Sequence, residues 1–436
     1  MSAITHIFRQ DAVPEQHRTN FLHLYLDIAW FGILNASTLS FISVYIVRIG
    51  ATKFQVGLLS AIPAILAIAL SVPAGWWLRN RPVDRATFWT SILFRMFYIV
   101  WVPLPLLFSE PTQVWFVLGV TFLMSIPGTA LAVGFNALFA DTVPPQWRGQ
   151  VAGIRNALLA VTFIVTSLIC GVLLDRVPFP LNYQIVFAIG FLGGAMSSYH
   201  LHKIRLTGEK PPRVGRTLGD LAMPGLARVI GDAIRPGVGL RFLTRVRSLR
   251  PPRFNTLRGP FGGVLLMLFV FHLTQYLAIP LFPIYLVDHL GLSDQELSLG
   301  NALFYGSVFV GSTQLAKLVA RLGNHKVTAL GAVLMASYPF LTSLTQGVGL
   351  YLVASVVGGI AWSLAGGALG NYLLDKIPAE DRPGYLAWYV VISNVSILLG
   401  SLGGPLFAEW IGLVPALMLI AVGRLMSALV IWRWGK

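Results

Sequence analysis

The sequence predicts an all-α integral membrane protein with twelve transmembrane helices in two pseudo-symmetric six-helix bundles. Two observations carry this prediction. First, 56% of the 436 residues are hydrophobic and only 11% are charged, with a mean hydropathy of +0.72, so the chain is far too apolar for a water-soluble domain. Second, the apolar segments form two equal sets, one on each side of a single long basic stretch.

Each apolar segment is long enough to cross a bilayer as a helix. A bilayer core of about 30 Å needs about 20 apolar residues per helix. Strands are not expected, because runs that alternate apolar and polar residues are missing and unpaired backbone groups are costly in lipid. Twelve segments meet the length, at about 21–47, 56–77, 87–108, 113–140, 150–174, 183–201, 261–287, 296–318, 326–345, 348–374, 384–408 and 412–432.

The basic stretch at residues 202–260 contains thirteen Lys or Arg and three acids, too many charges for a lipid environment. It divides the chain into an N-terminal bundle (1–201), a connector (202–260) and a C-terminal bundle (261–436). Within the connector, leucine and valine alternate with arginine over 240–250, which favours a short helix lying on anionic membrane lipid. A linker without regular structure is the alternative, because proline and glycine interrupt the stretch.

Positive charge predicts the orientation. With the N-terminus inside, twenty-six Lys or Arg fall on the cytoplasmic side and only Arg48, Lys53 and Arg176 fall outside, so both termini are expected in the cytoplasm. We expect a monomeric, multi-pass protein of a plasma membrane of the bacterial inner-membrane type. Because the basic residues lie in loops beside apolar spans, they predict no nucleic-acid partner.

Two motifs recur at matching positions in the two halves. Residues 41–61 and 281–302 share a pattern that aligns Tyr45 with Tyr285. Residues 141–148 and 375–382 both read Asp-x-x-Pro-x-x-x-Arg, and each follows the fourth span of its half. Two repeats at matched positions indicate a duplication.

With six plus six spans, a long central loop and an acid-Pro-Arg-Gly motif after spans four and ten, the chain resembles the major facilitator superfamily over essentially its whole length. The family's motif between spans two and three is degraded here, since Arg79 occupies its usual acidic position. The resemblance implies a transporter of a small molecule, with spans one, four, seven and ten around a central passage that opens alternately to each side.

The duplicated loops are expected to act as latches at the cytoplasmic mouth. Exposed ion pairs of this kind are worth only about 0–1 kcal/mol, so they would shift a conformational balance and not the folding. The expected gate residues are Asp141, Arg148, Asp375, Arg382, Arg79, Arg81 and Arg85.

Four charged residues fall well inside spans: Asp27, Arg95, Arg155 and Arg424. A charge in the membrane costs about 2.5–3.5 kcal/mol on insertion scales, so each needs a partner, water or a function. Asp27 is the one acid among them and the first candidate for carrying a coupling proton, with a static ion pair to Arg155 or Arg95 as the alternative. Arg155 is also a candidate to line the substrate passage.

Two spans carry matching polar faces. Asn35 and Thr38 lie on the same face of the first span as Asp27, and the repeat aligns Asn35 with Gln275 on the seventh span. Hydrogen bonding between helices is the alternative to lining a passage. His272 is the second candidate for proton coupling, and the remaining expected cavity residues are Tyr276, Asn136, Asn371, Trp388 and Tyr389.

These observations favour a secondary active transporter of a small solute, with efflux and uptake both open. Protons are the favoured coupling ion, because Asp27 and His272 can titrate. Facilitated or sodium-coupled uptake is one alternative, and a non-transporting receptor or lipid-handling protein on the same fold is another. Metalloprotease, P-loop and dinucleotide motifs are missing from the sequence, so no enzyme activity, cofactor or metal is expected.

Overall fold

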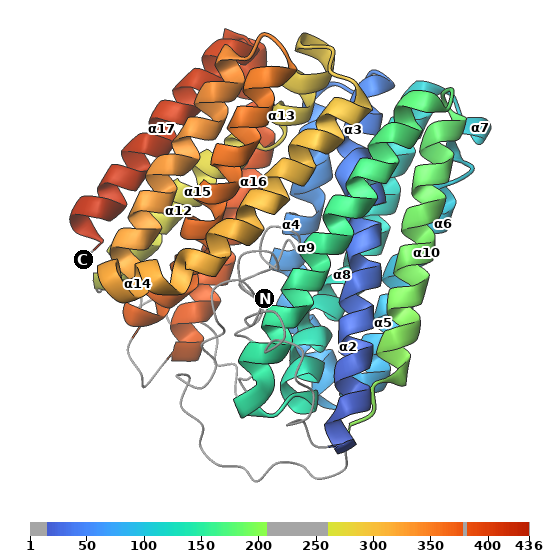
Figure 1. Ribbon diagram of the computed structural model, residues 1–436, viewed down its shortest axis with the longest axis vertical. Coiled ribbons are helices and arrows are strands. Elements are labelled where there is room, and N and C mark those ends of the chain that lie inside the picture. The colour runs from blue at the N-terminus through green and yellow to red at the C-terminus, as the bar shows by residue number, and fades with distance from the viewer. Residues whose placement is uncertain (1–14, 207–259, 378–381, 436) are drawn as a thin grey trace, which may run out of the picture.

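The computed structural model describes residues 15–206, 260–377 and 382–435, whose helices form two bundles side by side (Figure 1). The N-terminal bundle contains α2 (Glu15–Leu34), η2 (Asn35–Leu39), α3 (Ser40–Arg48), α4 (Lys53–Arg79), α5 (Val83–Arg95), α6 (Tyr98–Trp101), α7 (Leu104–Leu107), α8 (Glu110–Thr142), α9 (Pro145–Arg176) and α10 (Leu181–Lys203). The C-terminal bundle contains α12 (Pro260–Ala278), α13 (Leu281–Ile284), η6 (Tyr285–His289), α14 (Asp294–Leu344), α15 (Val348–Asp375), α16 (Arg382–Ile411) and α17 (Leu413–Trp434).

The predicted all-α membrane fold is confirmed, and every expected span contains helix. Nine stretches of helix in the described part of the chain are long and apolar enough to cross a membrane. One of them, α14, contains two expected spans, because its backbone turns at Gly323 with a φ of 78°. With α10 and the segment α5–α7, the arrangement is consistent with twelve crossings.

The third expected span, 87–108, is not one continuous helix as predicted. After α5 ends at Arg95, Val100 and Val102 donate backbone hydrogen bonds three residues back, to Phe97 and Ile99. Pro103 and Pro105 follow, and neither has an amide hydrogen for the next helical bonds. The chain therefore crosses this region as a broken helix.

The duplication seen in the sequence is visible in the backbone. Thr52 and Ser293 each begin a long helix with a capping box, completed by Gln55 and Glu296. A glycine with positive φ, Gly50 or Gly291, precedes each capping box by two residues. Such a conformation strains any residue with a Cβ, so both halves use the same turn for the same physical reason.

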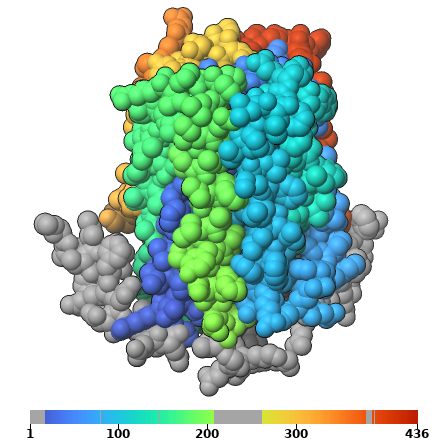
Figure 2. Space-filling view, turned by 90° about the vertical axis from the view of Figure 1, so that its right-hand side faces the viewer, coloured from blue at the N-terminus to red at the C-terminus, as the bar shows by residue number. Residues whose placement is uncertain are grey.

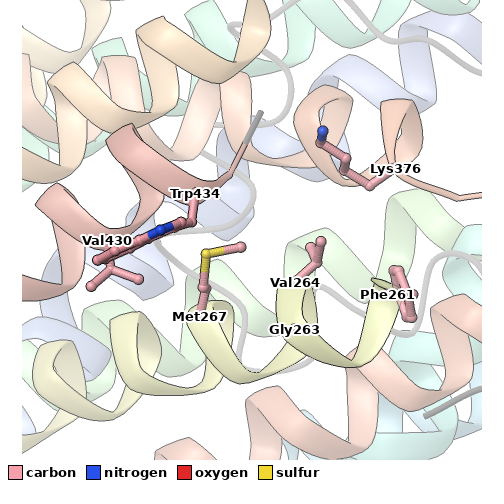
Figure 3. A pocket seen from close by; sticks show the side chains of 7 residues that line it. All are labelled: Phe261, Gly263, Val264, Met267, Lys376, Val430 and Trp434. Carbon is pink, nitrogen blue, oxygen red and sulfur yellow. The ribbon is translucent and has the colours of Figure 1, made fainter. Parts of the chain in front are cut away.

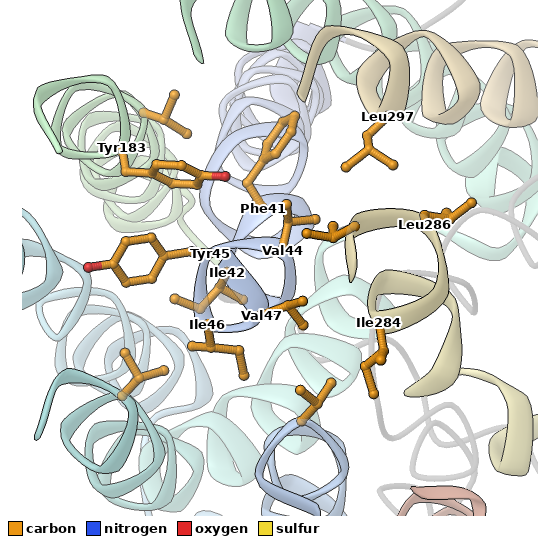
Figure 4. Packing of buried hydrophobic residues seen from close by; sticks show 14 of the residues in the cluster. Phe41, Ile42, Val44, Tyr45, Ile46, Val47, Tyr183, Ile284, Leu286 and Leu297 are labelled. Atoms are coloured by element: carbon orange, nitrogen blue, oxygen red, sulfur yellow. The ribbon is translucent and has the colours of Figure 1, made fainter. Parts of the chain in front are cut away.

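We call the end of the molecule near Arg48 the outer end and the end where α10 and α17 stop the inner end. Across the contact between the bundles, α4 packs against α16 and α9 packs against α14. At the outer end, apolar side chains of α3 share one buried cluster with Ile284, Leu286 and Leu297 from the other bundle (Figure 4). This apolar contact joins the two halves at the outer end. On the outside of the N-terminal bundle, α10 runs along the height of the molecule (Figure 2).

Glycine allows α12 and α16 to pack with their backbones in close contact. A Cβ added at Gly404 would overlap the carbonyl oxygen of Leu277, which belongs to the backbone and cannot rotate away. Gly404→Ala should therefore separate the helices and lower the melting temperature of the purified protein, in line with the roughly 1–3 kcal/mol cost of overpacking.

Gly119→Ala is the matched control, because a Cβ there meets nothing within 4 Å and alanine favours a helix over glycine by about 1 kcal/mol. Its melting temperature should stay the same or rise. Equal melting temperatures for the two variants would show that the α12–α16 contact does not need glycine.

Candidate functional site

The charged residues inside the N-terminal bundle meet at one buried carboxylate. Asp27 on α2 is 0% exposed. The Nη2 atom of Arg155, on α9, lies 3.2 Å from its Oδ2 atom, and Nη2 of Arg95, on α5, lies 3.9 Å from its Oδ1 atom. Ser197 on α10 donates a hydrogen bond of 2.5 Å to Oδ1. Four helices are thus joined by a cluster of two positive charges and one negative charge.

Arg155 has further partners that keep its guanidinium in place. It donates to the carbonyl oxygen of Leu24 at 2.7 Å and lies 4.8 Å from the ring centre of Phe135. Arg95 also donates to Ser198, at 3.1 Å. Sequence reasoning proposed both arginines as partners of Asp27, and the structure brings all three together. Arg155 therefore lies against Asp27 inside the bundle.

The repeat-related amides of the first and seventh spans are both buried with one polar atom left over. Asn35 and Gln275 are each 6% exposed. Within the described residues, Nδ2 of Asn35 and Oε1 of Gln275 have no hydrogen-bond partner. An unsatisfied buried group costs about 1–3 kcal/mol, so each such group calls for an explanation such as a bound water or ligand.

Most of the other expected cavity residues make contacts within their own bundle. Thr38 contacts Gly190 on α10 within its own bundle, and Tyr276 packs against Gly400 on α16. His272 Nε2 lies 3.0 Å from the hydroxyl of Tyr389, which links α12 to α16. Asn136 donates to the carbonyl of Ala132 in its own helix at 2.8 Å. Asn371 is partly buried on α15, and Trp388 packs against the buried cluster of the C-terminal bundle.

Arg424 is a buried cation that donates hydrogen bonds where the seventh span is interrupted. It is 5% exposed and donates to the carbonyl oxygens of Thr274, Gln275 and Met335 at 3.2, 2.8 and 3.1 Å. The helix α12 ends at Ala278, just before Pro280, so carbonyl groups near this point lose helical partners. Arg424 therefore stabilises the end of α12 next to Gln275.

Of the residues proposed for the cytoplasmic gate, Arg148 has the best-defined role. It is 6% exposed and donates to the carbonyl oxygens of Val143 and Ala140 at 3.0 and 2.6 Å, which caps the end of α8. Asp375 accepts a hydrogen bond of 2.8 Å from Asn324. Asp141 and Arg85 are exposed, and Arg81 lies 4.6 Å from the ring centre of Trp77. Outside the described residues lie the side chains of Arg79 and Arg382. Residues 207–259 of the connector, with the segment 240–250, lie outside them as well.

The outer end has an ion cluster between the bundles that sequence reasoning missed. Arg48 lies 2.9 Å from Asp294 and also donates to the carbonyl of Leu292 at 2.9 Å. The hydroxyl of Tyr183 is 3.1 Å from both carboxylate oxygens of Asp294, and the backbone amide of Asp294 donates to Asp175 at 3.0 Å. The available signal was charge, because Arg48 is one of the three bases expected outside, and Asp175 and Asp294 flank spans that are expected to end on the same side. We call these residues the outer latch.

The outer latch should hold the two bundles together at this end. If Arg48→Gln or Asp294→Asn removes about 1 kcal/mol from the closed arrangement, the open fraction should rise about fivefold. The measurement is the labelling rate of a cysteine placed at Val47, which is 3% exposed, by a water-soluble reagent added on the side of the membrane that the outer end faces. Arg176→Gln is the control, since Arg176 is an exposed arginine of the same end. Equal labelling rates in all variants would contradict a latch.

No group of three or more His, Cys, Asp or Glu side chains in the described ranges is placed to hold a metal ion.

Comparison with known proteins agrees with this architecture. The Major Facilitator Superfamily profile matches residues 28–253 and 264–436, whereas comparison with curated protein sequences gives no significant match.

Similar solved structures include a mutant of the nucleoside transporter NupG, with 12% identity, a TM-score of 0.67 and coverage of 95% of this chain and 100% of that one. The xylose transporter XylE from E. coli has 13% identity, a TM-score of 0.66 and coverage of 96% and 98%. The human organic anion transporter MFSD10 has 13% identity, a TM-score of 0.62 and coverage of 96% and 100%. The chain belongs to the Major Facilitator Superfamily.

Proposed function

We propose that this protein is a secondary active transporter that moves a small polar solute across the membrane by alternating access. The observation that carries the proposal is the pair of buried amides at Asn35 and Gln275, each with an unsatisfied polar atom. They lie on repeat-related spans, where a polar solute between the bundles would complete their hydrogen bonds. Such a solute would offset the cost of burying these two polar groups without partners.

The outer latch supports the alternating-access part of the proposal. Ion pairs and a shared apolar cluster join the bundles at the outer end, so the structure is closed on that side. In transporters of this kind the two bundles rock about a central site. Opening the outer end requires Arg48 and Asp294 to separate, which makes their interaction part of the transport cycle.

Protons are the proposed coupling ion, with Asp27 and His272 as the groups that take them up. Asp27 lies within 4 Å of two arginines of its own bundle. A shift of α9 or α5 within that bundle would change the charge around this carboxylate. We propose that this change links proton binding and release to transport.

The polar solute is tested with the purified protein in liposomes, using nucleosides, xylose and other sugars, and organic anions under a pH gradient. Asn35→Ala and Gln275→Ala should each raise the half-saturation concentration of the transported compound about fivefold, the effect of losing roughly 1 kcal/mol. Gln184→Ala is the control, because its amide already donates to the Val102 carbonyl at 3.1 Å. Unchanged transport in both test variants would contradict the site, and flux driven only by a sodium gradient would contradict proton coupling.

The proton role of Asp27 is tested with Asp27→Asn, which keeps the size of the side chain but cannot titrate. We expect this variant to lose accumulation driven by a pH gradient while retaining exchange of the substrate across the membrane. A folded variant that still accumulates substrate against its gradient would refute the role. Loss of folded protein that Arg155→Gln restores would identify a static ion pair.

A further inference from the structure

A pocket of about 420 Å³ opens at the inner end of the C-terminal bundle, away from the amides and ion clusters described above (Figure 3). Residues of α12 and α17 form its apolar lining, and Lys376 follows the last residue of α15. Among the described residues, Lys376 is the one charged residue of the lining. The pocket therefore combines an apolar surface with a single positive charge.

The pocket lies where the chain leaves the membrane. Three helix ends meet there: α12 begins at Pro260, α15 ends at Asp375 and α17 ends at Trp434. Trp434 is 66% exposed, and tryptophan is enriched at the level of the lipid head groups. Val430 lies one turn deeper, and Met267 lies six residues, or about 9 Å along α12, beyond Phe261. The pocket thus changes from polar to apolar with depth.

The polar rim is held in place by hydrogen bonds to the end of α17. The hydroxyl of Tyr372 donates to the carbonyl of Gly435 at 2.9 Å, and Nε2 of His325 lies 2.7 Å from the carbonyl of Ile431. The Lys376 ammonium lies 5.9 Å from the ring centre of Tyr372. Within the described residues, no acid lies within ion-pair distance of this ammonium, so its charge can meet an anion.

We propose that this pocket binds one anionic phospholipid of the adjacent leaflet. Its phosphate would lie at Lys376, its glycerol region beside the Trp434 ring, and one acyl chain along Val264, Met267 and Val430. A soluble anion would need the charge alone and an uncharged lipid the apolar lining alone. The polarity gradient along the pocket matches the lipid's own change from charged head group to hydrocarbon. This binding is separate from the solute transport proposed above.

The test uses Val430→Cys in the full chain, labelled with a small fluorophore and placed in bilayers. The native Cys170 is 0% exposed, so it does not compete for the label. Lipids with brominated acyl chains quench a fluorophore that they contact. Brominated phosphatidylglycerol should quench about fivefold more effectively than brominated phosphatidylcholine at equal mole fraction, as expected for one basic residue near the membrane surface.

Two variants separate the two parts of the site. Lys376→Gln should abolish the preference for phosphatidylglycerol, whereas Gly263→Trp should reduce quenching by both lipids, because a side chain at Gly263 enters open space within the pocket. Lys203→Gln is the matched control: Lys203 also follows a tyrosine by four residues and lies 5.2 Å from its ring centre, and the preference should persist.

Three outcomes would overturn the proposal. Equal quenching by the two lipids in the parent would indicate ordinary contact with bulk lipid. A preference that survives in Lys376→Gln would place the head group elsewhere. Quenching by neither lipid would show that protein fills the pocket.

Discussion

The structure depends on the requirement that buried polar and charged groups find partners within the protein, because lipid offers none. The helices meet most of this requirement through their own backbone bonds. Where a helix is interrupted or ends, long side chains supply the missing hydrogen bonds. Arg424 donates to three carbonyl groups beside the end of α12, and Arg148 caps α8. These arginines make it possible for helices to break or end in places where the backbone alone would be left unpaired.

The two halves of the duplicated chain meet this requirement in different ways. Both bundles retain the glycine turn and capping box at their outer end, since those features come from backbone geometry that every copy must satisfy. Their buried charges differ. The N-terminal bundle encloses a carboxylate between two arginines, whereas Arg424 of the C-terminal bundle is satisfied by carbonyl groups. The two halves therefore use different partners for the charged groups that they bury at mid-height.

The proposed function rests on places where this requirement is not met among the described residues. The amides of Asn35 and Gln275 are buried on repeat-related spans and each has one polar atom without a hydrogen-bond partner. The outer latch has the opposite property, because the carboxylate of Asp294 accepts hydrogen bonds from both Arg48 and Tyr183, and its backbone amide donates to Asp175. Exposed ion pairs are individually weak, so a modest change in free energy is enough to shift such a contact.

The sequence by itself determined the membrane fold, the helical segments and the duplication, because hydropathy, length and local turn chemistry are properties of neighbouring residues. It also pointed to Asp27, with Arg155 and Arg95 as candidate partners, since a charge in a span needs a partner, water or a function. The tertiary structure alone decided which atoms meet. It placed Thr38 against α10, used Arg148 as a helix cap, broke the third span near Pro103 and joined Arg48 to Asp294 across 246 positions of the chain. Contacts between residues so distant depend on how two bundles pack, and no local pattern in the sequence encodes that packing.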